Sequence, residues 1–552
     1  MNENSIKKKM GIKHFQTWFR QTFPETFIPP NPPTFDILAI DMNGIFHLCA
    51  EQFYGKHRYR RYNSHILFTK VPNLLFKHIC KKIEEICTLF SVRKYIILCM
   101  DGVAGMAKCQ QQRQRRFQTF LHEPSFDMNQ FSPGTILMDQ LSRYIDWYIH
   151  MNLSKHWKHC QIIFSNEKVP GEGEHKIFQF LHQWSNDHDQ ICIYSGDSDV
   201  ILLSLIHSFS IYVLRDVFPS NESYEFISIP LFRKSLLSHL EWTHSTIPFD
   251  TQLAYLDFVG LTCLLGNDFL PNIPSLYFPL HFPLLLQQYR THGSHCGHLF
   301  RFDLQRLIFT EHSALFFKNV GELEKSFIEI RYARQDGFFP DPIVIQNSRV
   351  IHNQFEIHQW KELKHQYYQS RFLEKDTTIV NHYMNGLEWV INYYFFGMND
   401  WNWYYPYHYA PFISDFDKIQ YTPQSFIKND APKPFLQLLM ILPPNSKSLL
   451  PFPLQKIMEE NSSLLSFFPN TFEIDVTGKN KEWEGIILIP FPDKKIFKTF
   501  FESQLPYISS FDHKRNIVGK NFIYQYQSNN LFTFHSVYGD IESCSVFKEF
   551  IL

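Results

Sequence analysis

The segment FDILAID (35–41) is a run of apolar residues that ends in a carboxylate. Similar runs, rich in Ile, Leu and Val, follow it along the chain: KYIILCMD (94–101), CQIIFS (160–165), DQICIYSG (189–196) and FSIYVLR (209–215). Continuous apolar runs of this length are typical of strands that are buried on both faces, as in parallel sheets. The first part of the chain is therefore predicted to build a mostly parallel sheet.

Segments with apolar residues at helical spacing lie between and after these runs. They predict helices at 73–90, 107–121, 136–152, 174–184 and 250–265. Strands that alternate with helices in this way indicate an α/β fold, in which a mostly parallel sheet is flanked by helices.

Beyond this region the pattern changes. From about 277 to 385 it weakens and shows no recognisable motif. The segment GLEWVINYYFFGMNDWNWYYPYHYAPFISDF (386–416) is dense in aromatic residues, and 417–552 alternates proline-rich turns with strand-like pieces such as EWEGIILIPF. We therefore expect a second, aromatic-rich helical and α+β part that packs on the sheet.

The composition is that of a folded protein, with 44% hydrophobic, 17% aromatic and only 19% charged residues. The formal net charge of −1 argues against a protein that coats nucleic acid non-specifically, so any nucleic-acid site must be a local patch. The ten cysteines form no CxxC pair and no zinc-like spacing, which indicates free thiols. The abundance of Phe, Ile, Asn, Lys and His is typical of an AT-rich genome and would fit a viral source.

No apolar run approaches the roughly 20 residues of a membrane span, and the basic start MNENSIKKKMGIKHF (1–15) lacks the apolar stretch of a secretory signal. We expect an intracellular protein with no membrane partner. The cytoplasm is expected rather than the nucleus, because the run Lys7–Lys9 is too short for a nuclear address. No heptad seam is visible, so a monomer is expected.

Acidic residues follow several of the predicted strands. In an open α/β sheet the crevice beyond the carboxyl ends of the strands is the usual ligand site, so acids placed there should converge. Two more acids lie in the glycine-flanked turn VPGEGEHKI (169–177) and another in LLGNDFLPNIP (264–274). The full set is Asp41, Asp101, Glu172, Glu174, Asp197, Asp199 and Asp268.

Each of these acids alone is equally well explained as a helix cap or a surface charge, since Glu is favoured at helix N-termini. Together in one crevice, they would repel each other strongly unless a cation compensated them. Carboxylates and water are the ligands that Mg²⁺ or Mn²⁺ prefers, and two such ions about 4 Å apart can clamp an in-line phosphoryl displacement. The acids therefore predict a site for two divalent ions.

A basic helix is predicted close to Asp101, in AKCQQQRQRRFQTF (107–120). Lys108, Gln112, Arg115 and Arg116 recur at i, i+4, i+7 and i+8, which places them on one helix face. Such a face suits a terminal phosphate, although a solvated basic helix has the same pattern. The cluster KHRYRR (56–61) is equally consistent with a nucleic-acid backbone contact and with a plain surface loop.

With these motifs the chain resembles the XRN family of 5′→3′ exoribonucleases, over roughly residues 10–500 and least clearly between 277 and 385. The motifs that carry the resemblance are MGIKHF (10–15), IDMNGIFH (40–47), MDGVAGMAKCQQQRQRRF (100–117), VPGEGEHKI (169–177), YSGDSDVILL (194–203), GNDFLPNIP (266–274), WNWYYPYHYAP (401–411), LPPNSKSLLP (442–451) and GIILIPF (485–491).

The resemblance implies roles for these residues. The acids take the family's metal-binding and catalytic positions, and the basic face of 107–120 takes the place of its 5′-monophosphate pocket. His47 matches the histidine that stacks on the first base, with Trp403 as its expected aromatic partner. Base stacking of this kind is worth about 1–3 kcal/mol and is indifferent to sequence. Without the resemblance, both rings would be interpreted as core residues.

The resemblance also implies an activity and a domain plan. The expected activity is processive, metal-dependent degradation of single-stranded RNA that carries a 5′-monophosphate, to mononucleotides, in RNA decay after decapping or cleavage. The expected domains are a nuclease domain of the PIN/5′-nuclease type (10–280), a variable connecting region (281–385) and a second region that completes the active-site pocket (386–552). The resemblance also leads us to expect a compact member, without the long extra domains of the large family members.

The sequence departs from the family's pattern at two places and leaves three other functions open. Gly105-Met106 replaces the family's usual Pro-Arg, which removes one basic side chain near the pocket, and the family's Met-Gly-Ile start falls at Met10. The alternatives are a flap-type 5′ DNA nuclease, a non-catalytic protein that binds RNA 5′ ends, and an added scaffold role in which 417–552 recruits decapping or transcription-termination factors.

Overall fold

The fold is that of a computed structural model of the chain. It describes residues 14–29, 34–54, 67–120, 126–217, 223–242, 245–334, 337–352, 354–372, 378–418, 421, 423, 425–529 and 531–551. The basic cluster KHRYRR (56–61) and the first four residues of MGIKHF (10–15) lie outside these described residues.

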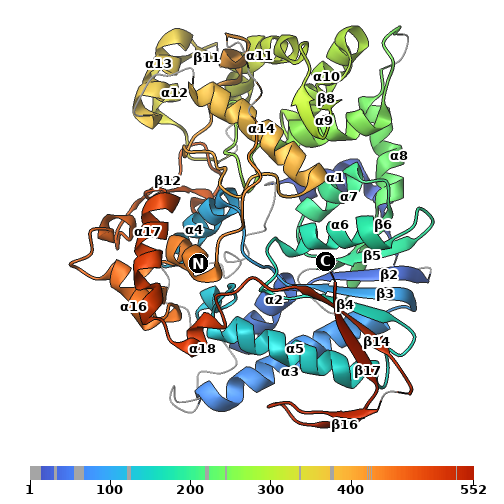
Figure 1. The fold of residues 1–552 in the computed structure, drawn as a ribbon. Coiled ribbons are helices and arrows are strands. Elements are labelled where there is room, and N and C mark those ends of the chain that lie inside the picture. Colours follow the sequence, from blue (N-terminus) through green and yellow to red (C-terminus); the bar gives the residue numbers. More distant parts are fainter. Residues whose placement is uncertain are drawn as a thin grey trace.

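In the described residues, a nine-stranded sheet forms the centre of the molecule (Figure 1). Its five middle strands are parallel, and an antiparallel pair extends it on each side. In spatial order the strands are β1 (Phe27–Ile28), β7 (Tyr224–Ser228), β6 (Ser210–Asp216), β5 (Gln190–Tyr194), β2 (Phe35–Asp41), β3 (Val92–Cys99), β4 (Gln161–Ser165), β14 (Asn521–Tyr526) and β17 (Val546–Ile551).

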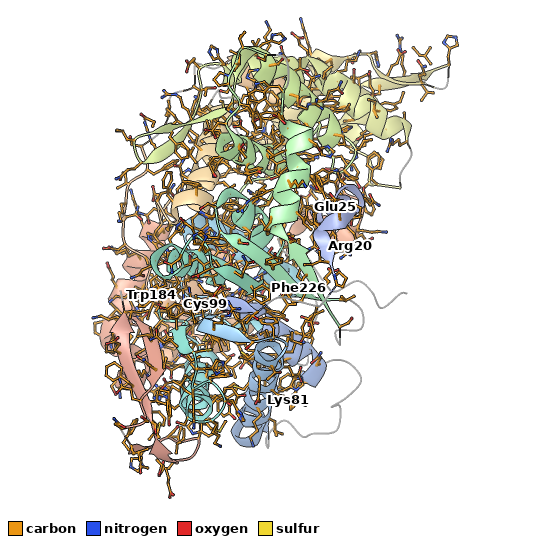
Figure 2. The ribbon with its side chains drawn as sticks, turned by 90° about the vertical axis from the view of Figure 1, so that its right-hand side faces the viewer. Arg20, Glu25, Lys81, Cys99, Trp184 and Phe226 are labelled. Atoms are coloured by element: carbon orange, nitrogen blue, oxygen red, sulfur yellow. The ribbon has the colours of Figure 1, made fainter. Side chains whose placement is uncertain are left out.

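The predicted α/β class with a mostly parallel sheet is confirmed. Every residue of β2 is buried, as expected for a strand covered on both faces. Successive side chains of a strand point to opposite faces, and β2 shows this directly. Ile37 and Ala39 pack into one apolar cluster, whereas Leu38 and Ile40 pack into the other. Cys99, at the end of β3, lies at the centre of the molecule with side chains on both sides (Figure 2).

Helices cover each face of the sheet. On one face lie α2 (Asn43–Tyr54), α3 (Leu67–Thr88) and α5 (Ile136–Leu153) (Figure 1). On the other lie α6 (Gly173–Trp184), α7 (Asp199–Ile206), α8 (Ile229–Leu240) and α9 (Thr251–Cys263), together with α1 (Phe15–Thr22). Helix α4 (Met106–Phe120) instead leaves the sheet and packs against the C-terminal part.

The segment without a recognisable sequence motif folds into helices and small hairpins. Its helices are α10 (Phe282–Cys296), α11 (Ser313–Ala333), α12 (Pro342–Gln346) and α13 (Trp360–Arg371). Its hairpins are β8 (Phe300–Asp303) with β9 (Arg306–Phe309), and β10 (Ser348–Ile351) with β11 (Gln354–Ile357). Helix α14 (Thr378–Phe396) then runs back toward the sheet and packs against α7 and α9 (Figure 1).

The C-terminal part has its own small core and also completes the main sheet. Its core holds α15 (Pro434–Ile441), α16 (Phe452–Gln455), α17 (Lys494–Gln504) and the hairpin β12 (Glu473–Asp475) with β13 (Ile486–Leu488). The last residues form α18 (Ser510–His513), the hairpin β15 (Phe532–Phe534) with β16 (Ile541–Cys544), and the sheet strands β14 and β17. Because these strands pair beside β4, residues of the predicted third segment belong to the same sheet as the first. The division at 280 and 385 stays a prediction.

None of the helices in the described part of the chain combines the length and the hydropathy needed to cross a bilayer. The ten cysteines are unpaired, as expected from their spacing, and all except Cys296 are buried.

Candidate functional site

Acidic side chains from separate elements meet at the carboxyl edge of the sheet. Asp41 is the last residue of β2, Asp101 follows β3, and Glu172 and Glu174 open α6. One carboxylate oxygen from each of Asp41, Asp101 and Glu174 lies within 4.8 Å of the other two, and the same holds for ligand atoms of Glu172, Glu174 and His175. The structure therefore brings these four predicted acids together and adds His175, which the sequence patterns did not single out.

The remaining acids stand beside this group. Asp197 follows β5, and Asp199 begins α7, where its backbone N–H donates to Asp197 Oδ1 at 3.1 Å. Asp268 lies in the loop after α9 and is close enough to help raise the pKa of Asp197, after the larger effect of burial. All the predicted acids thus face one region of the structure.

The glycines of the GEGE turn allow α6 to approach the two strand-end acids. A Cβ atom at Gly173 would lie 2.9 Å from Asp41 Oδ1 and 3.3 Å from Asp101 Oδ1. The Gly173 N–H instead donates to Asp101 Oδ1 at 2.7 Å. Gly171 has a φ of 110°, a region that side chains with a Cβ rarely adopt. Both glycines are therefore required by the position of the acids.

Neighbouring groups fix the orientation of the acids. Ser195 Oγ donates to Asp41 Oδ2 at 2.9 Å, and Asn43 Nδ2 donates to Asp101 Oδ2 at 2.7 Å. Below them, Lys176 Nζ donates to the carbonyls of Met100 at 2.8 Å and Asn166 at 3.0 Å, which ties the end of β3 to the turn that carries Glu172. The carboxylates are held in place by the protein before any ligand arrives.

Burial and mutual repulsion raise the pKa values of these acids. Burial, with the nearby Asp101, raises the pKa of Asp41 to about 7. Burial and Glu172 raise the pKa of Glu174 well above its usual value, and burial and Asp197 do the same for Asp199. Asp199 Oδ1 is buried and has no hydrogen-bond partner within the described residues. Crowded carboxylates with a free oxygen fit a hard divalent cation, which would replace the protons that the site otherwise retains.

Lys108 lies among the acids rather than in a separate phosphate pocket. Its Nζ is 2.7 Å from Asp268 Oδ2 and also forms an ion pair with Glu172. Burial lowers the pKa of Lys108, but Asp268 and Glu172 outweigh it and the pKa stands well above its usual value. The lysine is therefore charged and supplies part of the positive charge that the acids require.

Two turns further along α4, Arg115 and Arg116 lie close to His47. Arg116 is buried, its Nη1 has no hydrogen-bond partner within the described residues, and burial with the nearby Arg115 lowers its pKa to about 9. Burial, Arg115 and Arg116 together lower the pKa of His47 to about 4, so its ring is neutral. A buried guanidinium nitrogen without a partner is the feature expected of an anion site. Gln112, on the same helix face, accepts a hydrogen bond from Gln437 Nε2 at 3.3 Å.

The aromatic partner predicted for His47 is placed elsewhere. Trp403 stacks on Trp389, with ring centroids 4.5 Å apart, whereas the ring of His47 meets Phe131 edge-on at 5.4 Å. The carbonyl of Trp401, in the same aromatic segment, accepts from the N–H of Met106 at the start of α4. The assignment of Trp403 as the stacking residue stays a prediction.

The Gly105-Met106 departure has a packing explanation. Met106 is 1% exposed and packs with Cys109 and Phe117 into the core of the C-terminal part. A Cβ atom at Gly105 would lie 2.9 Å from the methyl carbon of Met398. These two residues therefore serve the close contact between α4 and the second half of the chain.

Two tyrosines of α14 complete the acid site, and sequence reasoning missed both. Tyr393 donates to Glu172 Oε1 at 2.8 Å, and its ring stacks on His175 at 3.9 Å. Tyr394 donates to Asp199 Oδ2 at 2.9 Å. Both rings are buried in the aromatic run NYYFF (392–396), whose composition alone does not distinguish a ligand-orienting hydroxyl from a core side chain.

Family comparisons agree with the motifs. The XRN 5′-3′ exonuclease N-terminus matches residues 10–125 and 119–217, and the Xrn1 helical domain matches 345–546. The chain is 28% identical to the 5′-3′ exoribonuclease 1 of Homo sapiens, over 92% of this chain and 35% of that protein. It is 26% identical to the 5′-3′ exoribonuclease 1 of Saccharomyces cerevisiae, over 98% of this chain and 46% of that protein.

This chain spans less than half the length of these two relatives. Among solved structures, the catalytic core of Rad2 in complex with DNA substrate aligns with 58% of this chain and 79% of that chain, at 17% identity and a TM-score of 0.31. That likeness is too weak for the two sites to be compared. The family matches, which cover both halves of the chain in the order of its motifs, show that this chain belongs to the XRN family of 5′-3′ exonucleases.

Proposed function

We propose that this chain is a 5′-3′ exoribonuclease, which removes mononucleotides one after another from single-stranded RNA that carries a 5′-monophosphate. The proposal rests on one observation: helix α4 connects the acid cluster to a buried guanidinium nitrogen that has no hydrogen-bond partner within the described residues. Lys108 of this helix forms ion pairs with two of the acids, and Arg116 carries the nitrogen of the anion site. The two lie roughly 12 Å apart along α4, from the rise of an α-helix.

The acids would hold Mg²⁺ or Mn²⁺, and their number is sufficient for two ions. Asp41, Asp101, Glu172 and Glu174 supply clustered oxygens, and Asp199 supplies a free one. When bound, such ions lower the pKa of an attacking water and stabilise the leaving oxygen. The protein's own contribution is to hold the carboxylates through Ser195, Asn43 and the α14 tyrosines, and to keep Lys108 charged beside them.

The direction of degradation would follow from the anion site. A terminal phosphate fits the guanidinium groups of Arg115 and Arg116, with Gln112 on the same helix face. The neutral ring of His47 is suited to stacking on the first base. A closed pocket for a single phosphate excludes a cap or a triphosphate. After each cleavage the new 5′ end again carries a phosphate, so the same pocket can receive it.

The proposal extends to where the protein acts and with which partners. We propose that the protein is an intracellular, cytoplasmic monomer with a role in RNA decay. Residues 417–552 would recruit decapping or termination factors.

The test uses one RNA with a 5′-monophosphate, 5′-triphosphate or 5′-hydroxyl end, and a DNA copy with the monophosphate. Each is incubated with Mg²⁺ and with either the wild type or Asp197→Ala/Asp199→Ala. We expect mononucleotides only from the monophosphorylated RNA and only with the wild type. Preferred cleavage of the DNA would favour a flap-type nuclease, and tight binding without cleavage would favour an RNA-end-binding protein. Either result would overturn the proposal.

The α14 tyrosines give a separate prediction about cation binding. Tyr393→Phe removes the hydroxyl that orients Glu172, and loss of such a supporting hydrogen bond typically weakens metal affinity about 10–100-fold. Titration calorimetry with Mn²⁺ measures the effect. Tyr289→Phe is the matched control, because Tyr289 donates to the buried Asp257 at 2.8 Å, outside the acid cluster. Equal affinities for the two variants would show that Tyr393 only fills space.

A further inference from the structure

Three histidines lie at the junction between α10 and α11. His292 and His295 are near the end of α10, and His312 stands immediately before α11. The two helices pack against each other away from the sheet, at the top of Figure 1. This junction lies outside residues 10–217 and 345–546, which the family models match, so the family matches assign no role to these histidines.

The ring of His292 points from α10 across to α11. It meets the ring of Phe316 edge-on, with the ring centroids 5.7 Å apart. His312 precedes Phe316 by four residues, and its backbone is helical with φ −88° and ψ −12°, so the two lie on one face of α11. His295 follows His292 by three residues and shares its face of α10. The three imidazoles are therefore carried on the facing sides of the two helices.

His292 is buried and its ring has no polar partner. Only 4% of the residue is exposed, and neither Nδ1 nor Nε2 has a hydrogen-bond partner within the described residues. A neutral imidazole carries one N–H donor and one acceptor nitrogen, and both are unsatisfied here. Burial, together with the nearby His312 and His295, lowers the pKa of His292 to about 4. The ring is thus held in the neutral form that binds metal ions.

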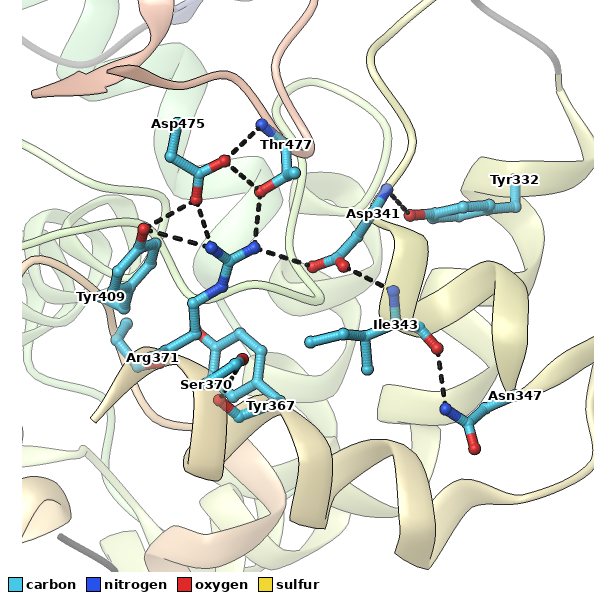
Figure 3. A network of polar contacts seen from close by, with 11 residues as sticks. Tyr332, Asp341, Ile343, Asn347, Tyr367, Ser370, Arg371, Tyr409, Asp475 and Thr477 are labelled. Atoms are coloured by element: carbon cyan, nitrogen blue, oxygen red, sulfur yellow. Dashed lines mark hydrogen bonds and ion pairs between the residues drawn. The ribbon is translucent and has the colours of Figure 1, made fainter. Parts of the chain in front are cut away.

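Two buried groups in the same half of the chain show the usual arrangement. Both ring nitrogens of His298 are engaged: Nδ1 lies 2.9 Å from Asp257 Oδ2, and Nε2 accepts from a backbone N–H at 2.9 Å. Arg371 donates to Asp475 Oδ2 at 2.6 Å and to a threonine hydroxyl at 2.9 Å (Figure 3). Because buried polar groups in folded proteins are normally paired in this way, the ring of His292 indicates a missing ligand.

The other two histidines open the junction to solvent. His295 and His312 are exposed, and His312 Nε2 lies 3.9 Å from Glu311 Oε1, which adds a carboxylate at the same place. The three imidazoles do not lie within 4.8 Å of one another, as the clustered acids do, so two of them must rotate to share an ion. Exposed side chains change rotamer within nanoseconds, so the two exposed rings can close on an ion that enters from solvent.

We propose that His292, His295 and His312 bind a Zn²⁺ ion that fastens the end of α10 to the start of α11. Three imidazole nitrogens, with water or Glu311 in the fourth tetrahedral position, form a typical zinc donor set. Imidazole suits zinc, whereas Mg²⁺ prefers oxygen ligands, so this site and the acid cluster take different ions. The proposal does not depend on the proposed exoribonuclease function.

The ion closes the loop that contains the hairpin β8–β9, and this hairpin is bonded to α14. The N–H of Leu307 donates to Asn392 Oδ1 at 2.8 Å, and the N–H of Phe309 donates to Glu388 Oε1 at 2.8 Å. Helix α14 also carries the two tyrosines that orient the acids. Zinc at the junction therefore stabilises the hairpin against which this helix rests.

Titration calorimetry with Zn²⁺ tests the site, in excess Mg²⁺ to occupy the acid cluster. The variants are His295→Ala and His312→Ala, whose exposed side chains are not needed for folding. Loss of a group that only supports a metal ligand weakens affinity about 10–100-fold, so we expect each variant to lose at least that much. His159→Ala removes an exposed histidine in the loop before β4 and should bind zinc like the wild type.

Asp197→Ala/Asp199→Ala distinguishes this site from the acid cluster. We expect the double variant to keep the zinc affinity of the wild type. Zinc binding that is lost in the double variant and unchanged in His295→Ala and His312→Ala would assign the ion to the acids and overturn the proposal. Absence of zinc binding by the wild type in excess Mg²⁺ would overturn it as well.

Hydrogen exchange of the wild type gives a readout that does not depend on a buried substitution. Saturation with zinc in excess Mg²⁺ should slow amide exchange in 290–296 and 300–316, and should have no such effect in His312→Ala. Unchanged exchange of both segments in the wild type would contradict the proposal. None of these measurements needs RNA cleavage, so failure of the zinc site and failure of the exoribonuclease function are separate results.

Discussion

Gly173→Ala is expected to lower the rate of mononucleotide release at least about 100-fold, while the protein stays folded. The added Cβ would lie 2.9 Å from Asp41 Oδ1, closer than a Cβ atom tolerates, and 3.3 Å from Asp101 Oδ1, which is also tight. These oxygens cannot simply move aside, because Ser195 holds Asp41 and Asn43 holds Asp101. Either the carboxylates separate or the start of α6 shifts with Glu172 and Glu174. Displacements of about 1 Å at a reaction centre can cost about 100-fold in rate.

The matched control is Gly196→Ala. Gly196 lies next to Asp197 in the same site, but a Cβ there would meet nothing within 4 Å. The rate is measured with monophosphorylated RNA and Mg²⁺, and thermal melting reports folding. We expect Gly196→Ala to retain most of the wild-type rate. If Gly173→Ala were as active as Gly196→Ala, the close approach of α6 to the acids would not matter for the reaction.

Arg113→Met is expected to destabilise the protein by about 3 kcal/mol and to loosen the C-terminal part. Arg113 is 1% exposed, and its guanidinium donates to the carbonyls of Met440 at 2.9 Å, Pro490 at 3.3 Å and Phe467. Each buried carbonyl left without its donor costs about 1–3 kcal/mol. Burial of the charged guanidinium is unfavourable and lowers the pKa of Arg113 to about 9. Methionine removes this cost, which offsets part of the loss.

Urea unfolding and limited proteolysis of 430–500 measure this effect. Arg113→Lys should show most of the loss, since an ammonium group does not have the planar fork that reaches several carbonyls. Arg143→Met serves as the control, because Arg143 is 54% exposed and its ion pair is with Asp139, one turn away, so its loss should cost little. An unchanged urea midpoint for Arg113→Met would contradict the anchoring role.

The central strands were predictable because burial on both faces leaves a continuous apolar run. FDILAID (35–41) coincides with β2, and the acids that follow the strands mark the site. Strands β14 and β17 were not assigned to this sheet. The alternating FIYQY (522–526) is typical of any half-exposed strand, and nothing local in the sequence specifies β4 as its neighbour.

Within the site, the sequence indicates the position of a residue where that position follows from one element, whereas contacts between two elements depend on the fold. Helical spacing places Lys108 and Arg116 on one face of α4, but Lys108 pairs with Asp268 because the loop after α9 comes within reach. Tyr393 and Tyr394 reach the acids only because α14 returns to the sheet. Trp403 was selected from a motif, and its contact with Trp389 depends on how that segment folds over α14.

The pairing of β4 with β14 has a consequence for how this chain folds during synthesis. Phe164 pairs with Phe522, so β4 obtains its second neighbour only after the residues up to Phe522 have left the ribosome. Until then, Ile162, Ile163 and Phe164 lie at an open edge of a hydrophobic sheet, a state that favours aggregation. Contacts so distant in sequence also slow folding. Production of active protein is therefore expected to depend on chaperones that shield this edge until residues 521–551 can pair with it.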